Sequence, residues 1–227
     1  MKYIVIGLGY FGSTLASNLT RQGHEVIGVD KRAEKIDELK ESISIVMELD
    51  STNQNAVKTL PIQDVDAIIV AIGEDIGSSI LTLTILKNLD ANRIIGRAIT
   101  PLHRNILTQI GIKEIVQPEE DSALLVSSML QIKNAKRVIE LNEESSIAEI
   151  MVPTKYIGHN LDSVNIESRF NLKLIAVKIF LKERMLDVFN TSECKISFEL
   201  DKERPLRETD VLVLAGSVDD IKKFIES

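Results

Sequence analysis

The sequence predicts an α/β protein in which a doubly wound parallel sheet is followed by a small α+β domain. Three observations support this prediction. Short apolar runs alternate with amphipathic stretches of helical length, a glycine-rich turn joins the first run to the first helical stretch, and the alternation stops near residue 134. Parallel strands need long crossover connections, so regular alternation is typical of a parallel sheet with helices on both faces.

The alternation predicts each element of the first domain in turn. Strands are expected near residues 2–6, 25–29, 43–47, 67–72, 93–97 and 113–117. Helices are expected near residues 11–21, 33–40, 53–59, 77–89, 101–109 and 120–132. In such a sheet a ligand binds outside the carboxyl ends of the strands, at the point where the winding order reverses. The residues that follow each strand are therefore the candidate binding residues.

The turn after the first strand has the sequence Gly7-Leu-Gly9-Tyr-Phe-Gly12. Gly7 permits a tight turn, Gly9 lets the backbone approach a phosphate, and Gly12 lets the new helix pack against the sheet. The start of that helix presents free N–H groups to an anion. This context predicts a Rossmann-like nucleotide site. It leaves open the alternative that the glycines only shape a turn and the site is empty.

Two carboxylates are expected to face the crevice. Asp30 ends the second strand 18 residues after Gly12, where it can accept hydrogen bonds from a ribose hydroxyl. Asp50 follows the third strand and is read either as a residue on the adenosine side or as the cap of a helix over 52–59. The further candidates at the same strand ends are Tyr10, Phe11, Lys31, Ser51, Ala71, Ile72 and Gly73.

Charged residues also follow the fifth and sixth strands. Arg97 is placed where a cation can reach a phosphate, although an ordinary surface arginine explains the spacing nearly as well. Glu119, Glu120 and Asp121 open the next helical stretch, where acidic residues commonly interact with the helix dipole, so chemistry alone favours that role over metal binding. His103 lies in an expected first helical turn and is interpreted as structural.

Composition limits the compartment and the partners. The 227 residues are 44% hydrophobic, enough for one large domain or two modest ones. Cys194 is the single cysteine, which excludes an intrachain disulfide and favours a reducing, cytoplasmic compartment. The net charge of −7 disfavours nucleic-acid binding. No apolar run approaches the roughly 20 residues that a membrane-spanning helix needs.

The composition changes near residue 134, so we expect one domain over 1–134 and a second over 135–227. In the second domain, residues 145–151 are read as a short capped helix, 173–180 and 210–215 as strands, and a closing helix begins at Ser217. This part of the sequence contains no His/Cys metal spacing, no Ser/His/Asp grouping and no second glycine-rich loop. A role in assembly or sensing is therefore expected.

Further motifs extend along nearly the whole chain. They are residues 6–12, 23–30, 71–75, 97–98 and 111–121, together with Val152-Pro153, Gly158, Leu161, Arg169 and 210–216 in outline. In these motifs the chain resembles the RCK (KTN) regulatory subunits of bacterial potassium transporters, of the KtrA/TrkA type with an N- and a C-terminal RCK domain. The segment Gly111-Ile-Lys-Glu-Ile-Val-Gln-Pro-Glu119 is more specific than the glycine motif, because ordinary dehydrogenases have no reason to keep it.

The resemblance implies a cytoplasmic subunit on the inner face of the membrane, without enzymatic activity. Homodimers would assemble into an octameric ring beneath a membrane-embedded potassium-translocating subunit of the TrkH/KtrB type. ATP or ADP, or alternatively NAD or NADH, would reshape the ring and gate potassium flow.

The resemblance also implies roles for individual residues. Gly7, Gly9 and Gly12 would line the phosphates, and Arg97 would meet the terminal phosphates. Glu119 would hold a divalent cation, Mg²⁺ or Ca²⁺, near the nucleotide at the dimer interface. The remaining roles follow the strand ends: Asp30 would bind the ribose, Asp50 and Ser51 would lie on the adenosine side, and Ala71 to Gly73 would form the crevice wall.

Two positions depart from the family pattern. Tyr10 stands where relatives commonly have an arginine that reaches a γ-phosphate across the dimer, so discrimination of ATP from ADP is expected to be weaker or to rely on Arg97. Glu167 stands near the expected place of an arginine that binds cyclic di-AMP in some relatives. An acid there would repel a phosphate, so this ligand is not predicted. An NAD(P)-dependent oxidoreductase and a scaffold without a ligand are the alternative functions.

Overall fold

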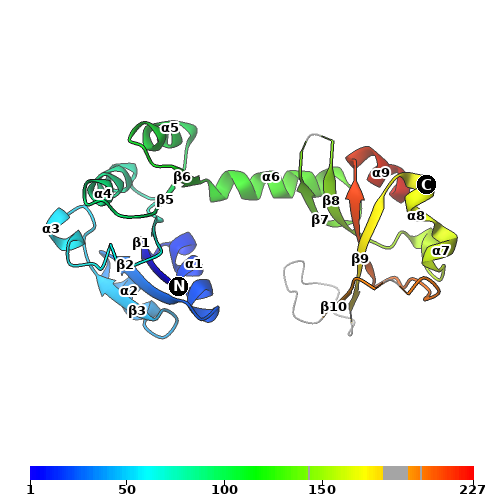
Figure 1. The fold of residues 1–227 in the computed structure, drawn as a ribbon, viewed down its shortest axis with the longest axis horizontal. Helices are drawn as coiled ribbons and strands as arrows, with labels where there is room; N and C mark the ends of the chain where they lie inside the picture. The colour runs from blue at the N-terminus through cyan, green and yellow to red at the C-terminus, as the bar shows by residue number, and fades with distance from the viewer. Residues whose placement is uncertain (143, 181–193, 200) are drawn as a thin grey trace. The chain divides into compact units, whose positions relative to one another are not determined.

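The computed structural model describes residues 1–142, 144–180, 194–199 and 201–227 (Figure 1). It divides into two compact units, Met1–Glu119 and Glu120–Ser227. This division lies before the domain boundary expected at residue 134, because most of helix α6 (Pro118–Gln131) groups with the second unit. Ser128 on α6 donates a hydrogen bond to Glu140 at 2.7 Å, which ties the helix to that unit.

The first unit is built on a six-stranded sheet in the order β3-β2-β1-β4-β5-β6. Every strand pair in it is parallel, as the alternation predicts. The strands are β1 (Lys2–Ile6), β2 (Glu25–Asp30), β3 (Ile45–Glu48), β4 (Ala67–Val70), β5 (Ile94–Arg97) and β6 (Glu114–Val116). The winding order reverses between β1 and β4, so the binding crevice of this sheet lies at the carboxyl ends of these two strands.

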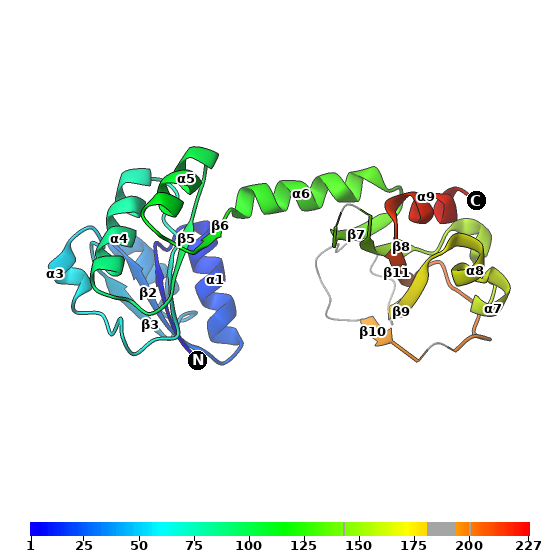
Figure 2. The ribbon, with the colours of Figure 1, turned by 45° about the horizontal axis from the view of Figure 1, so that its top comes forward.

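Helices cover both faces of this sheet, which confirms the doubly wound architecture (Figure 2). Ala16 and Ile36 pack on one face, whereas Leu83 and Leu107 pack on the other. The helices are α1 (Tyr10–Arg21), α2 (Ala33–Leu39), α3 (Gln54–Val57), α4 (Ile76–Asn88) and α5 (Pro101–Gln109). The burial of one apolar stripe on each helix is what fixes the helices against the sheet.

The three glycines of the turn after β1 differ in why the fold needs them. Gly7 has φ +92°, a left-handed conformation in which a side chain is strained. Gly12 packs so closely that an added Cβ would overlap the carbonyl oxygen of Gly7 and approach the Cβ of Ala71 to 3.0 Å. An added Cβ at Gly9 would meet no atom within 4 Å. Gly7 and Gly12 are therefore required by the fold, whereas Gly9 leaves open space.

The second unit contains a five-stranded sheet in the order β10-β9-β11-β8-β7, and each of its strand pairs is antiparallel. Its strands are β7 (Ala135–Glu140), β8 (Ser146–Met151), β9 (Lys173–Phe180), β10 (Cys194–Ser197) and β11 (Val211–Gly216). A 3₁₀ turn (Thr154–Tyr156) and helices α7 (Leu161–Val164), α8 (Ile166–Phe170) and α9 (Val218–Glu226) complete it. Phe224 of α9 stacks on Tyr156 with ring centroids 5.1 Å apart, inside the core of this unit.

The helix expected over 145–151 is wrong, because Ser146–Met151 forms strand β8. Ser146, Ala148 and Ile150 are buried, and the residues between them are half-buried. This period of two is that of a strand with one face on a core. β8 pairs with β7 on one side and β11 on the other, so sheet hydrogen bonds outweigh the local helix signal of the serines.

A Gly12→Ala substitution tests the packing of the turn. We expect it to lower the free energy of unfolding by about 1–3 kcal/mol, because the added methyl group forces the helix away from the carbonyl of Gly7. Gly9→Ala is the matched control and should change the stability by less than about 0.5 kcal/mol, since its methyl group lies in open space. Urea unfolding followed by circular dichroism measures both. Equal losses in the two variants would contradict the packing argument.

Candidate functional site

The glycine-rich turn and the loop after β4 lie side by side at the crevice. The backbone N–H of Ala71 donates to the carbonyl of Ile6 at 2.7 Å, which extends the β1–β4 pairing to the end of both strands. Ile72 closes against Gly7, where an added Cβ would lie 2.9 Å from the Ile72 side chain. The structure thus brings together the residues predicted after β1 and after β4.

The first turn of α1 faces this crevice with no side-chain cap. Helix α1 begins at Tyr10 after the N-cap Gly9, and neither a capping side chain nor an acidic residue occupies its first turn. The first N–H groups of a helix lack intrahelical acceptors and carry the positive end of the helix dipole. Together with the open space at Gly9, this arrangement suits a phosphate group. The Tyr10 side chain is 92% exposed.

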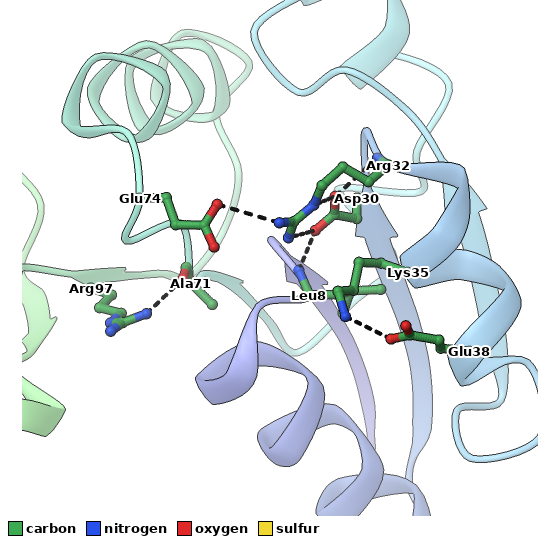
Figure 3. A network of polar contacts seen from close by, with 8 residues as sticks. All are labelled: Leu8, Asp30, Arg32, Lys35, Glu38, Ala71, Glu74 and Arg97. Carbon is green, nitrogen blue, oxygen red and sulfur yellow. Dashed lines mark hydrogen bonds and ion pairs between the residues drawn. The ribbon is translucent and has the colours of Figure 1, made fainter.

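Asp30 lies at the end of β2 and is only 6% exposed. Its carboxylate accepts a hydrogen bond from the backbone N–H of Leu8 at 2.7 Å, which joins β2 to the glycine-rich turn (Figure 3). It also accepts from the backbone N–H of Arg32 at 3.0 Å and from the guanidinium of the same residue. Asp30 is therefore fixed at the predicted ribose position by contacts from two loops.

Burial alone would raise the pKa of Asp30, but hydrogen bonds outweigh that cost. The Arg32 side chain contributes most to holding the pKa below its usual value, and the backbone N–H groups of Leu8 and Arg32 add to it. The carboxylate is therefore charged across the neutral range.

Arg97 contacts several of the predicted crevice residues. Its Nη1 donates to the carbonyl of Ala71 at 3.3 Å, and its guanidinium lies 5.3 Å from the centre of the Phe11 ring. Its side chain is only 14% exposed and forms an ion pair with Glu119. An added Cβ at Gly73 would lie 2.6 Å from Arg97 Nη1, so the glycine makes room for the guanidinium. Arg97 is thus a packed residue of the crevice rather than an ordinary surface arginine.

Glu119 faces Arg97 from the start of α6. Burial acts to raise the pKa of Glu119, but hydrogen bonds from its own backbone N–H and from Arg97 lower it below its usual value. The described residues hold no group of three or more His, Cys, Asp or Glu side chains arranged to bind a metal ion. Within one chain, Glu119 is therefore a single carboxylate paired with an arginine.

Asp50, which follows β3, does not cap the next helix, contrary to one of the two expectations for this residue. Asn53, not Asp50, caps the helix that follows, by accepting hydrogen bonds from the N–H groups of Asn55 and Ala56. Asp50 instead accepts from Thr52 through its backbone N–H at 3.0 Å and its hydroxyl at 2.7 Å. The helix-cap reading of Asp50 is therefore wrong, since this short helix begins later than expected.

Ser51 follows Asp50 and Lys31 follows Asp30, and these two residues differ in burial. Ser51 is 7% exposed, and its hydroxyl lies 2.9 Å from that of Thr82 on α4. Lys31 is exposed, and its charge helps to lower the pKa of Asp50 after the hydrogen bonds from Thr52.

Comparison with known proteins places the chain in a family. Residues 3–118 match the TrkA-N domain. The Ktr system potassium uptake protein C of Bacillus subtilis (strain 168) is 32% identical over 98% of this chain and 95% of that protein. The Ktr system potassium uptake protein A of the same organism is 30% identical over the same shares of the two chains. The chain belongs to the RCK regulatory subunits of Ktr/Trk potassium uptake systems.

Solved structures support the fold of this RCK chain. The RCK domain of GsuK superposes with a TM-score of 0.64 at 19% identity, covering 100% of this chain and 47% of that one. The GsuK channel bound to NAD gives the same TM-score and identity, and this chain covers 39% of it. This chain thus spans less than half of the GsuK chains. At this identity the likeness concerns the fold, and it confirms the two-part α/β architecture.

Sequence reasoning missed one residue of this RCK crevice, Arg32. Its guanidinium lies on Asp30 and also contacts Glu74 in the loop after β4, with Nη1 3.3 Å from the carboxylate (Figure 3). The available signal was a basic residue two positions after the predicted ribose carboxylate.

In the described part of the chain, no helix is long and apolar enough to cross a membrane.

The depressed pKa of Asp30 predicts a pH dependence of stability. A group whose folded-state pKa is lowered stabilises the fold above its unfolded pKa of about 3.9, and this contribution is lost as the pH falls through the folded pKa. Asp30→Asn should therefore cost about 1–3 kcal/mol at neutral pH, and the difference from wild type should shrink below about pH 4. Urea unfolding across this pH range measures it. A difference that stays constant with pH would contradict the charged role of Asp30.

Proposed function

We propose that this chain is a cytoplasmic nucleotide-sensing subunit that gates a potassium uptake system. The observation that carries the proposal is the uncapped start of α1 beside the buried Asp30 carboxylate, at the β1/β4 reversal, in a chain of the Ktr/Trk family. An anion site next to a ribose acceptor fits an adenine nucleotide. We propose ATP or ADP as the ligand, with NAD or NADH as the alternative.

The nucleotide would lie along the carboxyl ends of the strands. Its phosphates would meet the turn from Gly7 to Gly12 and the guanidinium of Arg97. Arg97 suits this role because its Nε is buried and has no hydrogen-bond partner among the described residues. The ribose would meet Asp30. Asp50 and Ser51 would lie on the adenosine side, and Ala71, Ile72 and Gly73 would form the crevice wall. The remaining proposed contacts are Tyr10, Phe11 and Lys31.

We propose that the first domain, 1–134, senses the nucleotide, and that the second, 135–227, regulates and dimerises. Homodimers would form an octameric ring on a membrane-embedded subunit of the TrkH/KtrB type, which would place the chain at the inner face of the membrane. Apolar side chains exposed on α6 support a self-association surface, namely Leu124, Val126 and Leu130.

Gating requires that the nucleotide bind one shape of the ring better than another. A ligand with equal affinity for both shapes shifts nothing, and coupling energies of about 1–3 kcal/mol are typical. Phosphates that contact both chains of a dimer would supply this difference. Because Tyr10 cannot supply a positive charge across the dimer, Arg97 is the residue we propose to sense the terminal phosphate.

A Gly9→Asp substitution tests the crevice. We expect nucleotide binding to be lost while the fold is kept, because the new carboxylate would occupy the open phosphate position and repel the anion. Thr14→Asp adds the same charge on the exposed side of α1 and should bind normally. Calorimetric titration with ATP, ADP, NAD and NADH, with the mass of each complex measured by light scattering, provides the readout. Retained binding in Gly9→Asp would overturn the crevice, and nicotinamide binding alone by a dimer would favour the oxidoreductase.

We further propose Glu119 as a ligand of a divalent cation, Mg²⁺ or Ca²⁺, near the nucleotide at the dimer interface. Its ion pair with Arg97, the residue proposed to meet the terminal phosphates, supports this assignment. A second carboxylate from a partner chain would complete a better oxygen site than one chain offers alone.

Glu119→Gln should weaken the dependence of nucleotide affinity on the divalent cation by about tenfold, since a neutral amide is a poorer ligand for these ions. Glu120→Gln, at the exposed neighbouring position, is the control and should leave that dependence as in wild type. Titrations with and without the cation measure it. An unchanged dependence in Glu119→Gln would remove Glu119 from the site.

A further inference from the structure

The Arg32 side chain donates hydrogen bonds to the Asp30 carboxylate, the group proposed to bind the ribose. Its Nε donates to one oxygen of Asp30 at 2.9 Å, and its Nη2 donates to the other at 3.0 Å. Its remaining terminal nitrogen reaches Glu74, so the guanidinium bridges the end of β2 and the loop after β4 (Figure 3). One cation therefore spans the adenosine end of the crevice between two acidic side chains.

The hydrogen-bonding capacity of Asp30 is filled by this arrangement. A carboxylate offers about four acceptor positions. The N–H of Leu8 and the Arg32 Nη2 occupy one oxygen, and the N–H and Nε of Arg32 occupy the other. A pair of ribose hydroxyls can donate to Asp30 only after some of these donors leave.

The donor that can leave is the guanidinium. The two backbone N–H groups are fixed by the turn after β1 and by the chain that follows Asp30 directly. The Arg32 side chain is flexible and 37% exposed, and its contact with Glu74 involves a carboxylate that is itself 81% exposed. This outer ion pair with Glu74 contributes little net free energy, so water can replace it. The pair with the buried Asp30 is stronger, and ribose hydroxyls that donate to the same carboxylate oxygens would replace the guanidinium there.

We propose that Arg32 is an intramolecular competitor of the nucleotide ribose. The side chain covers the Asp30 carboxylate and moves off it when a nucleotide ribose binds. This inference rests on the nucleotide-binding function proposed above. Only molecules in which Arg32 has left Asp30 can bind the ribose. The apparent dissociation constant of the nucleotide is therefore the constant for these molecules divided by the fraction of the protein that they represent. A side chain that is closed about nine-tenths of the time weakens binding about tenfold.

A different role for Arg32 would be recognition of a 2′-phosphate, as an arginine near the second strand does in some dinucleotide sites. The observed contacts disfavour that role. Asp30 and Glu74 hold the guanidinium between them, and both carboxylates would repel a phosphate placed on it. The competitor role needs only the hydrogen bonds that the structure contains.

The test combines a protein variant with a ligand variant. ATP and 2′,3′-dideoxy-ATP are titrated into wild type, Arg32→Ala and Lys35→Ala by calorimetry at one salt concentration. Arg32→Ala should bind ATP about three- to tenfold more tightly than wild type and dideoxy-ATP within about twofold of wild type, because only ATP competes for Asp30. Lys35→Ala removes the same charge from a residue that pairs with Glu38, and should match wild type for both ligands.

Asp30 keeps two backbone donors in Arg32→Ala, so the fold is expected to persist, and thermal unfolding checks it. Arg32→Gln replaces it if the alanine variant does not fold. Equal effects on the two ligands, or weaker ATP binding in Arg32→Ala, would overturn the competitor role. A selective loss of NADP affinity in that variant would overturn it in favour of 2′-phosphate recognition. If wild type and both variants fail to bind ATP, ADP and NAD, the proposed function fails together with this inference.

Discussion

The hydrogen bond from the Leu8 N–H to the Asp30 carboxylate is the interaction on which the crevice depends. It joins the glycine-rich turn after β1 to the end of β2 at 2.7 Å, and both groups are buried. A buried charge needs such partners, because an unpaired carboxylate in this position would be strongly destabilising. The same contact fixes Asp30, the proposed ribose acceptor, beside the uncapped start of α1. The proposed phosphate and ribose positions therefore belong to one corner of the sheet.

The second constraint is the reversal of strand order between β1 and β4. Because β4 lies next to β1, the loop that contains Ala71 and Gly73 faces the glycine-rich turn directly. Arg97, from the next strand, can then pack over Phe11 and reach the same opening. The crevice of this chain thus contains two arginines that are held by carboxylates, Arg97 by Glu119 and Arg32 by Asp30 and Glu74. In the proposed function Arg97 meets the phosphates, whereas Arg32 competes with the ribose for Asp30.

The sequence predicts the first domain well because its signals are local and periodic. Buried parallel strands are short apolar runs, and the separate roles of Gly7 and Gly12 follow from backbone sterics. The strand Ser146–Met151 was not predicted, because its serines suggest a helix cap and one of its two pairing partners, β11, lies about 60 residues further along the chain. The role of Arg32 was missed for another reason. Its contact with Asp30 is local, but its contact with Glu74 forms only when the fold brings β2 and the loop after β4 together.

The most direct test of the account is a crystal structure of the chain with ATP bound. The account predicts the ribose hydroxyls on the Asp30 carboxylate, the phosphates over Gly9 at the start of α1, and the Arg32 side chain turned away from Asp30. A nucleotide bound elsewhere, with Arg32 still on Asp30, would contradict the assignment of this crevice as the sensing site.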